Sequence, residues 1–352
     1  MTEHEARNCS PQKKPRHINI PIFIPHLGCP NNCVFCNQRS ISGHGYFDIT
    51  SVRGEIEAAV RTVDYSSSEV EIAFFGGSFT GIDRDEMIYL LSVAKEYIDA
   101  GKAGAVRIST RPDYIDDEIL DILEKYRVTD IELGLQSMDD GVLALSKRGH
   151  TAKTAKNACR LIKSRGFTLV GQMMIGLPGS DIGKEVATAE EIASLCDGAR
   201  IYPTVVFEGT ELCEMTRSGE YIPLSLDDAV IRSEAALDVF IKAGIPVLRL
   251  GLCASDNLSD PEKAVAGVGH SALGELVYGE HYMRVIREYI GKHKLDLSGK
   301  RVILHAPPGE ISKVSGQKKR NKRRLISEFG AVDVRIAADD TLREYEVRIE
   351  TV

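Results

Sequence analysis

The chain has 352 residues, of which 43% are hydrophobic, and its 44 Lys and Arg against 51 Asp and Glu leave a formal net charge of −7. This length allows a large buried core, and the negative charge excludes a polycation that binds nucleic acid over its whole surface, so RNA contact would need a local basic patch. The N-terminus lacks the apolar segment of a secretory signal, and no apolar run is long enough to cross a bilayer. We therefore expect a cytoplasmic protein without membrane contact.

The first 16 residues are polar, and we expect them to form a disordered tail. From residue 17 onward, segments typical of strands alternate with segments of helical periodicity. The predicted strands are 17–25, 69–75, 105–110, 130–137, 167–176 and 199–207, and the helices between them are 52–63, 83–100, 116–126, 152–165 and 180–195. This alternation predicts an α/β fold with a parallel sheet and helices packed outside it. Six units suit either an open doubly wound sheet or a partial barrel, and periodicity does not distinguish the two.

The pattern changes towards the C-terminus. A helix at 226–243, an added strand at 245–252 and a helix at 271–291 extend the alternating region. A strand at 301–306, a basic helix at 313–328 and strands at 331–337 and 343–350 follow. We expect a core with its extension over 17–298 and a small basic α/β module over 299–352.

Three of the eight cysteines lie in one short loop, Cys29-Pro-Asn-Asn-Cys33-Val-Phe-Cys36, after the first predicted strand. A [4Fe–4S] cluster is normally held by four thiolates, so three would leave one iron open to a ligand. A structural zinc site closes all four positions, and His26 or His44 is a candidate for a fourth ligand. The spacing and the α/β pattern favour the cluster. The remaining cysteines are expected to be small buried apolar residues: Cys9, Cys159, Cys196, Cys213 and Cys253.

This cysteine loop resembles that of the radical S-adenosylmethionine superfamily. Over about residues 17–280 the chain is further similar to the catalytic subunit of Elongator, the radical enzyme that modifies the wobble uridine of tRNA. The similar runs are STRPDY (109–114), IELGLQS (131–137), RGHT (148–151), IYPTVV (201–206), EGTEL (208–212) and GELV (274–277) with His270 before it.

The resemblance implies an incomplete (β/α)6 TIM-like barrel with a [4Fe–4S] cluster on Cys29, Cys33 and Cys36 and S-adenosylmethionine on the open iron. An external electron donor of the ferredoxin or flavodoxin type would reduce the cluster. Cleavage would then yield methionine and a 5′-deoxyadenosyl radical that abstracts hydrogen from a substrate. The residues that the resemblance places against the cofactor are Phe35, Gly76, Gly77, Ser78, Ser109, Gln136 and Gly176. Those that it places at the reacting groups are Arg111, Gln172 and His270, and we add Glu132 because a carboxylate in an apolar strand needs a partner.

Most of these residues end predicted strands, where the site of a parallel barrel lies. Gly76-Gly77 suits a tight turn against a ligand, although an ordinary strand-to-helix turn has the same pattern. Arg111 precedes Pro112, which keeps it extended, and it suits a carboxylate partner. Glu132 lies in an apolar strand and needs a partner. We expect it to contact the ligand or Arg148 rather than to form only an interior ion pair.

Two features depart from Elongator. Its catalytic subunit carries a C-terminal acetyltransferase domain and a longer spacing between the first two cysteines, whereas this sequence ends at Val352. We therefore expect no acetyl transfer by this chain.

A basic run without acidic residues lies near the end: Lys313, Lys318, Lys319, Arg320, Lys322, Arg323 and Arg324.

The basic run loosely resembles a KH module, whose GxxG loop clamps nucleic-acid backbone, but the second glycine after Gly316 is missing. The alternative is a solvated helix face. We expect RNA contact from Lys318, Lys319, Arg320 and Arg323.

Three functions are compatible with these features. We favour a radical enzyme that acts in tRNA modification. The alternatives are a radical enzyme that acts on a small molecule, like the oxygen-independent coproporphyrinogen oxidases, and a non-catalytic iron–sulfur protein that binds RNA.

Overall fold

A curled sheet of parallel strands forms the larger part of the protein. The computed structural model describes residues 16–24, 29, 33–36, 47–65, 67–252, 260 and 262–352. The strand order is β1-β2-β3-β4-β5-β6-β8, and every neighbouring pair is parallel. The strands are β1 (Arg16–Ile24), β2 (Ser68–Gly76), β3 (Ala105–Thr110), β4 (Val128–Gln136), β5 (Thr168–Ile175), β6 (Gly198–Pro203) and β8 (Val247–Leu250). The predicted partial α/β barrel is thus confirmed. Residues 1–15 of the predicted tail lie outside the described residues, whereas Arg16, its last residue, begins β1.

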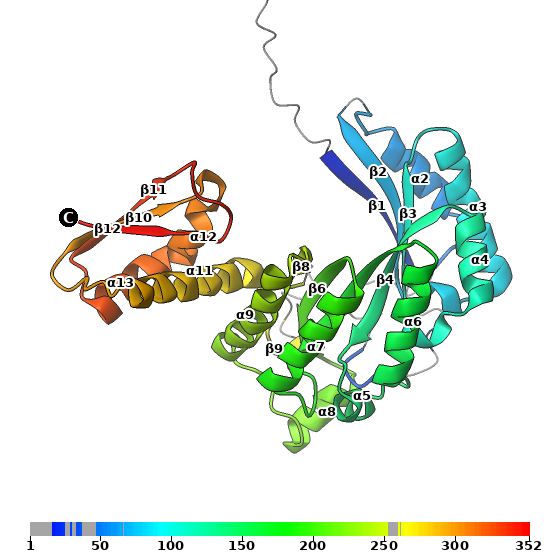
Figure 1. The fold of residues 1–352 in the computed structure, drawn as a ribbon. Helices are drawn as coiled ribbons and strands as arrows, with labels where there is room; N and C mark the ends of the chain where they lie inside the picture. The colour runs from blue at the N-terminus through cyan, green and yellow to red at the C-terminus, as the bar shows by residue number, and fades with distance from the viewer. Residues whose placement is uncertain are drawn as a thin grey trace, which may run out of the picture.

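Helices connect successive strands and cover the outer side of the curled sheet (Figure 1). Their packed faces place side chains such as Leu90, Leu91 and Leu120 against strand residues such as Phe74 and Ile108, all fully buried. Side-chain caps fix several helix starts, such as those provided by Asp83 and Asp116. The helices are α2 (Val52–Val60), α3 (Arg84–Asp99), α4 (Asp117–Lys125), α5 (Asp140–Leu145), α6 (Ala152–Ser164), α7 (Ile182–Leu195), α8 (Glu211–Ser218) and α9 (Leu226–Ala243).

The predicted strand at 199–207 divides at Thr204. The Thr204 backbone N–H and Oγ1 both donate to the Ile175 carbonyl, at 2.9 and 2.8 Å. These two hydrogen bonds turn the chain out of the large sheet. The residues after it form β7 (Val205–Phe207), which pairs antiparallel with β9 (Ala264–Gly267). The predicted strand at 245–252 is β8, and it extends the large sheet beside β6.

A second, three-stranded sheet lies at the far end of α11 (Leu273–Lys292), away from the large sheet (Figure 1). Its order is β11-β10-β12, from β10 (Arg301–Ala306), β11 (Asp333–Ala338) and β12 (Arg348–Thr351). Its core includes Met283, Ile286 and Ile290 from the second half of α11. This helix therefore contributes side chains to both hydrophobic cores. The domain boundary that we predicted at residue 299 lies after the end of this helix.

The single basic helix predicted at 313–328 is wrong. The structure has α12 (Ile311–Ser315) and α13 (Arg320–Phe329), with a turn at 316–319 between them. Gly316, Lys318 and Lys319 all have positive φ, at 71°, 50° and 62°, and this geometry interrupts the helix. None of the helices in the described ranges has both the length and the apolar character needed to cross a membrane.

Candidate active site

A cavity of about 190 Å³ opens at the carboxyl ends of β2 to β5, where the site of a parallel barrel is expected. It brings together most of the residues that the sequence indicated: Cys29, Cys33, Phe35, Cys36, Gly76, Gly77, Ser109, Arg111, Glu132, Gln136 and Gln172. Further residues complete its lining: Thr110, Gly134, Arg148 and Met174. Segments that are more than a hundred residues apart in the chain therefore share one cavity.

The cysteine loop is docked onto the rest of the protein through Val34. Its side chain is buried against Val206, Leu212 and Tyr221. The Val34 N–H donates to the Ser146 carbonyl at 3.3 Å, and the Val34 carbonyl accepts from the Leu212 N–H at 2.8 Å. These contacts hold the segment between Cys33 and Cys36 against α5 and α8.

The cysteines around the cavity have a polar setting. Burial raises the pKa of the Cys29 thiol, while the charges of Arg111 and Arg148 offset part of that rise. Among the described residues, no group of three or more Cys, His, Asp or Glu side chains is close enough together to hold one metal ion, as a zinc site would require. His26 and His44, the candidates for a zinc ligand, lie outside the described residues.

The other cysteines lie away from the cavity lining. Cys159, Cys196 and Cys213 are buried free thiols, as predicted. Cys9 and Cys253 fall outside the described residues.

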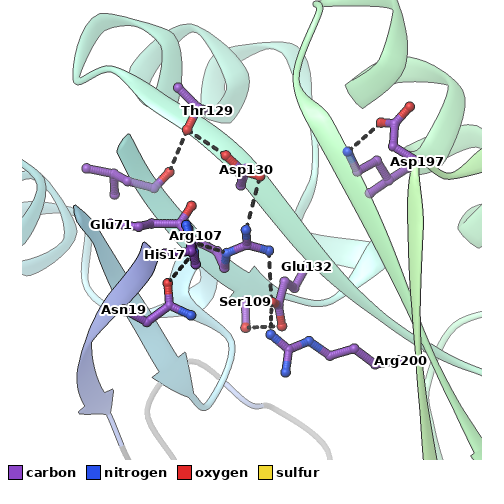
Figure 2. Close-up of polar contacts among 12 residues, drawn as sticks. His17, Asn19, Glu71, Arg107, Ser109, Thr129, Asp130, Glu132, Asp197 and Arg200 are labelled. Atoms are coloured by element: carbon purple, nitrogen blue, oxygen red, sulfur yellow. Dashed lines mark hydrogen bonds and ion pairs between the residues drawn. The ribbon is translucent and has the colours of Figure 1, made fainter. Parts of the chain in front are cut away.

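An ion-pair network lies in the sheet interior beside the cavity (Figure 2). Arg107 pairs with Glu71 at 2.8 Å, Asp130 at 3.2 Å and Glu132 at 3.1 Å, and Arg200 pairs with Glu132 at 2.5 Å. The Ser109 hydroxyl donates to the same Glu132 carboxylate at 3.5 Å. Buried charges need such partners because desolvation is costly.

Glu132 thus takes its ion pairs from Arg107 and Arg200, whereas we expected Arg148. Arg148 instead donates to Cys33 Sγ and to the Gly134 carbonyl. The residues near Glu132 in the sequence could not identify these two arginines as its partners. Arg107 lies on β3 and Arg200 on β6, which flank the β4–β5 pair in the sheet. Contact between Glu132 and a ligand stays a prediction.

Two backbone features shape the cavity wall. Gly76 has a φ of 116°, and a Cβ atom there would lie 2.5 Å from the Ile24 carbonyl oxygen, so this position needs glycine. The register of β4 against β5 shifts between Gly134 and Gln136, and Gln136 has a φ of 65°. Within the described part of the chain, the buried Gln136 Oε1 has no hydrogen-bond partner. A buried acceptor without a partner on a cavity wall is a candidate ligand contact.

Three predicted residues are not part of the cavity lining. Ser78 is fully buried and shares a hydrogen bond of 2.9 Å with the Thr110 hydroxyl. Gly176 has both backbone groups engaged, because its N–H donates to Glu185 at 2.7 Å and its carbonyl accepts from the Tyr221 hydroxyl at 2.6 Å. His270 is exposed, and its Nδ1 accepts from the Ala272 N–H at 3.1 Å.

The predicted RNA-binding residues lie on the C-terminal module. Lys318, Lys319 and Arg323 are exposed, and Arg320 pairs with Asp227 at 3.1 Å.

The donor set in the cavity fits an iron–sulfur group with an organic ligand. The three thiols that line the cavity can bind three irons of a cluster and leave a fourth free. The unpaired Gln136 oxygen and the buried guanidiniums provide polar groups for that ligand.

Comparisons with known proteins agree with this fold. Residues 23–192 match the model of the Radical SAM superfamily, and residues 196–284 match that of the Radical_SAM C-terminal domain. The tRNA uridine(34) acetyltransferase of Methanocaldococcus infernus is 35% identical over 327 residues, 79% of this chain and 60% of that protein. Elongator complex protein 3 of Mus musculus is 28% identical over 256 residues, 63% of this chain and 46% of that protein.

Among solved structures, archaeal Methanocaldococcus infernus Elp3 with an N-terminal deletion shares the fold at a TM-score of 0.58 and 24% identity. That match covers 80% of this chain and 64% of the other. The chain thus spans about half the length of the curated relatives it matches.

Proposed function

The chain belongs to the radical S-adenosylmethionine superfamily, whose members bind a [4Fe–4S] cluster and S-adenosylmethionine, and from this we propose that it starts radical chemistry on a tRNA. One observation carries the proposal. The cavity at the strand ends unites the three cysteines with Ser109, Gln136 and other polar groups from β3 to β5.

The residues of the cavity have separable roles in this proposal. Cys29, Cys33 and Cys36 hold the cluster, which when bound supplies the electron that splits the sulfonium of S-adenosylmethionine. Gln136 offers its unpaired amide oxygen to the cofactor. Gly76 keeps the wall open, because a larger residue would collide with the backbone of β1. The enclosing strands exclude water from the reacting groups.

A tRNA substrate is supported by the relatives and by the C-terminal module. The Methanocaldococcus infernus relative is a tRNA uridine(34) acetyltransferase. Three cations of the basic run are engaged with acidic residues: Lys313, Arg320 and Arg324. The others form no ion pair within the described ranges: Lys318, Lys319, Lys322 and Arg323. These four can therefore meet phosphates without first breaking an ion pair.

The proposal includes an external one-electron donor of the ferredoxin or flavodoxin type and a cytoplasmic location, where such a donor and tRNA are both present.

The radical reaction is tested by anaerobic reconstitution with iron and sulfide, followed by an assay for 5′-deoxyadenosine. We expect the wild type to show the EPR signal of a reduced [4Fe–4S] cluster and to release 5′-deoxyadenosine. Cys33→Ala should lose both, whereas Cys159→Ala, which removes a buried thiol outside the cavity, should keep both. A wild type that binds zinc, or no metal, would refute the proposal.

The substrate is tested by tRNA binding over a range of salt concentrations. Each phosphate contact that is lost should reduce the slope of log K against log salt by about 1. We expect Lys318→Ala with Lys319→Ala to weaken binding and flatten the slope. The matched control, Lys102→Ala with Lys125→Ala, removes two exposed cations of the larger domain and should leave binding unchanged. Equal tRNA binding by both double variants would refute the contact of Lys318 and Lys319 with tRNA.

The product is tested by mass spectrometry of tRNA nucleosides from cells with and without the protein. An identical nucleoside profile in both cell lines would refute the tRNA substrate.

A further inference from the structure

Two arginine side chains reach the sulfur of Cys33 from the segments after β3 and β4. Arg148 Nη1 lies 3.3 Å from Cys33 Sγ, and Arg111 Nη1 lies 3.9 Å from it. Both arginines are buried, with 6% and 3% of their surface exposed. Because a guanidinium stays protonated in a protein, two positive charges are fixed beside one of the three cysteines.

Both guanidiniums are held by groups outside the cysteine loop. Arg148 Nη2 donates to the Gly134 carbonyl at 2.7 Å. Arg111 forms a two-point ion pair with Asp113, at 3.0 Å for each contact, and also donates to the Arg148 carbonyl. A guanidinium held at several points cannot rotate away from the sulfur without losing these bonds.

Hydrogen bonds to the ligating sulfurs, net charge and burial set the reduction potential of an iron–sulfur cluster. The reduced cluster carries one more negative charge than the oxidised one, so a fixed positive charge favours the reduced form. The cluster is reduced by one electron from an external donor of the ferredoxin or flavodoxin type, and the arginines neither gain nor lose a proton.

We infer that Arg148, with Arg111 beside it, raises the reduction potential of a cluster bound through Cys33. This inference rests on the proposed function, because it needs the cluster. Arg148 is then a positioning and tuning residue for the reducible group. From the sequence alone we expected Arg148 only as a partner for Glu132.

The test is an EPR-monitored redox titration of the reconstituted full-length protein under anaerobic conditions. We expect Arg148→Met to lower the equilibrium constant for reduction about tenfold, which for a one-electron couple is a potential about 59 mV more negative. Arg148→Lys keeps the charge and Arg148→Gln keeps an amide donor, so both should lie between Arg148→Met and the wild type. These two milder variants keep the test decisive if Arg148→Met binds too little cluster.

The matched control is Arg232→Met, which removes an arginine paired with Glu185 outside the cavity. It should keep the wild-type potential. Arg148 variants that bind the cluster and titrate at the wild-type potential would refute the inference and leave the proposed function intact. Lower cluster content at an unchanged potential would indicate a structural role and would also refute it. A wild type without a cluster would instead refute the proposed function, and this inference with it.

Discussion

His150 provides a test of the packing behind the cysteine loop. Its ring is fully buried, and its Nδ1 lies 3.9 Å from Asp113 Oδ1, next to the ion pair that holds Arg111. Burial, together with the charge of Arg148, lowers the pKa of His150 from 6.5 to about 4. The folded protein therefore keeps this imidazole neutral under conditions where the unfolded chain protonates it.

The effect on stability follows from proton linkage. Between pH 6.5 and 4 the unfolded chain binds more protons than the folded one, so stability is greatest above pH 6.5 and falls as the pH is lowered. The full shift corresponds to about 3 kcal/mol at 1.36 kcal/mol per pKa unit. About 2 kcal/mol of it should be lost between pH 7.5 and 5.

The assay is urea unfolding followed by circular dichroism at several pH values from 7.5 to 5, for the wild type and for His150→Gln. The variant lacks the titrating group, so its free energy of unfolding should fall about 2 kcal/mol less than that of the wild type over this range. His293→Gln, a change at an exposed histidine that ends α11, should follow the wild type. Parallel curves for the wild type and His150→Gln would show that His150 is not held neutral by burial.

The remaining predictions concern single contacts. Gly76→Ala should lower the free energy of unfolding by about 3 kcal/mol, the sum of positive-φ strain and collision with the Ile24 carbonyl. Gly104→Ala, where the nearest atom is 3.8 Å away, should be neutral or slightly stabilising in the same urea experiment; equal losses would contradict the assigned geometry. Glu132→Gln removes the carboxylate that pairs with Arg200, while Arg107 keeps Glu71 and Asp130, and it should cost about 3 kcal/mol by chemical denaturation, whereas a loss below about 1 kcal/mol would mean that the network is well solvated. Tyr221→Phe removes the hydroxyl that donates to the carbonyl after β5 and should cost about 1 kcal/mol, and an unchanged midpoint in urea would refute this bond.

The resemblance to the radical S-adenosylmethionine superfamily indicated the residues at strand ends, and their positions in the chain agree with it. The cysteines, Gly76-Gly77, Ser109, Gln136 and Gln172 occur in or after separate predicted strands, and in parallel strands these ends meet at one edge. The structure places all of them around one cavity. The break at 316–319 was not predictable from helical periodicity, because Lys318 and Lys319 take a backbone conformation that lysine rarely adopts.

Periodicity and motif spacing alone determined the order of strands and helices, the place of the cysteine loop and the edge of the sheet at which the site lies. These features are local, because they depend on residues that are close together in the chain. Only the tertiary structure decided that Glu132 pairs with Arg107 and Arg200, that Arg148 reaches Cys33, and that Gly176 and His270 lie outside the cavity lining. A buried charge takes whichever partner the packing brings near it, and no local pattern in the sequence encodes that choice.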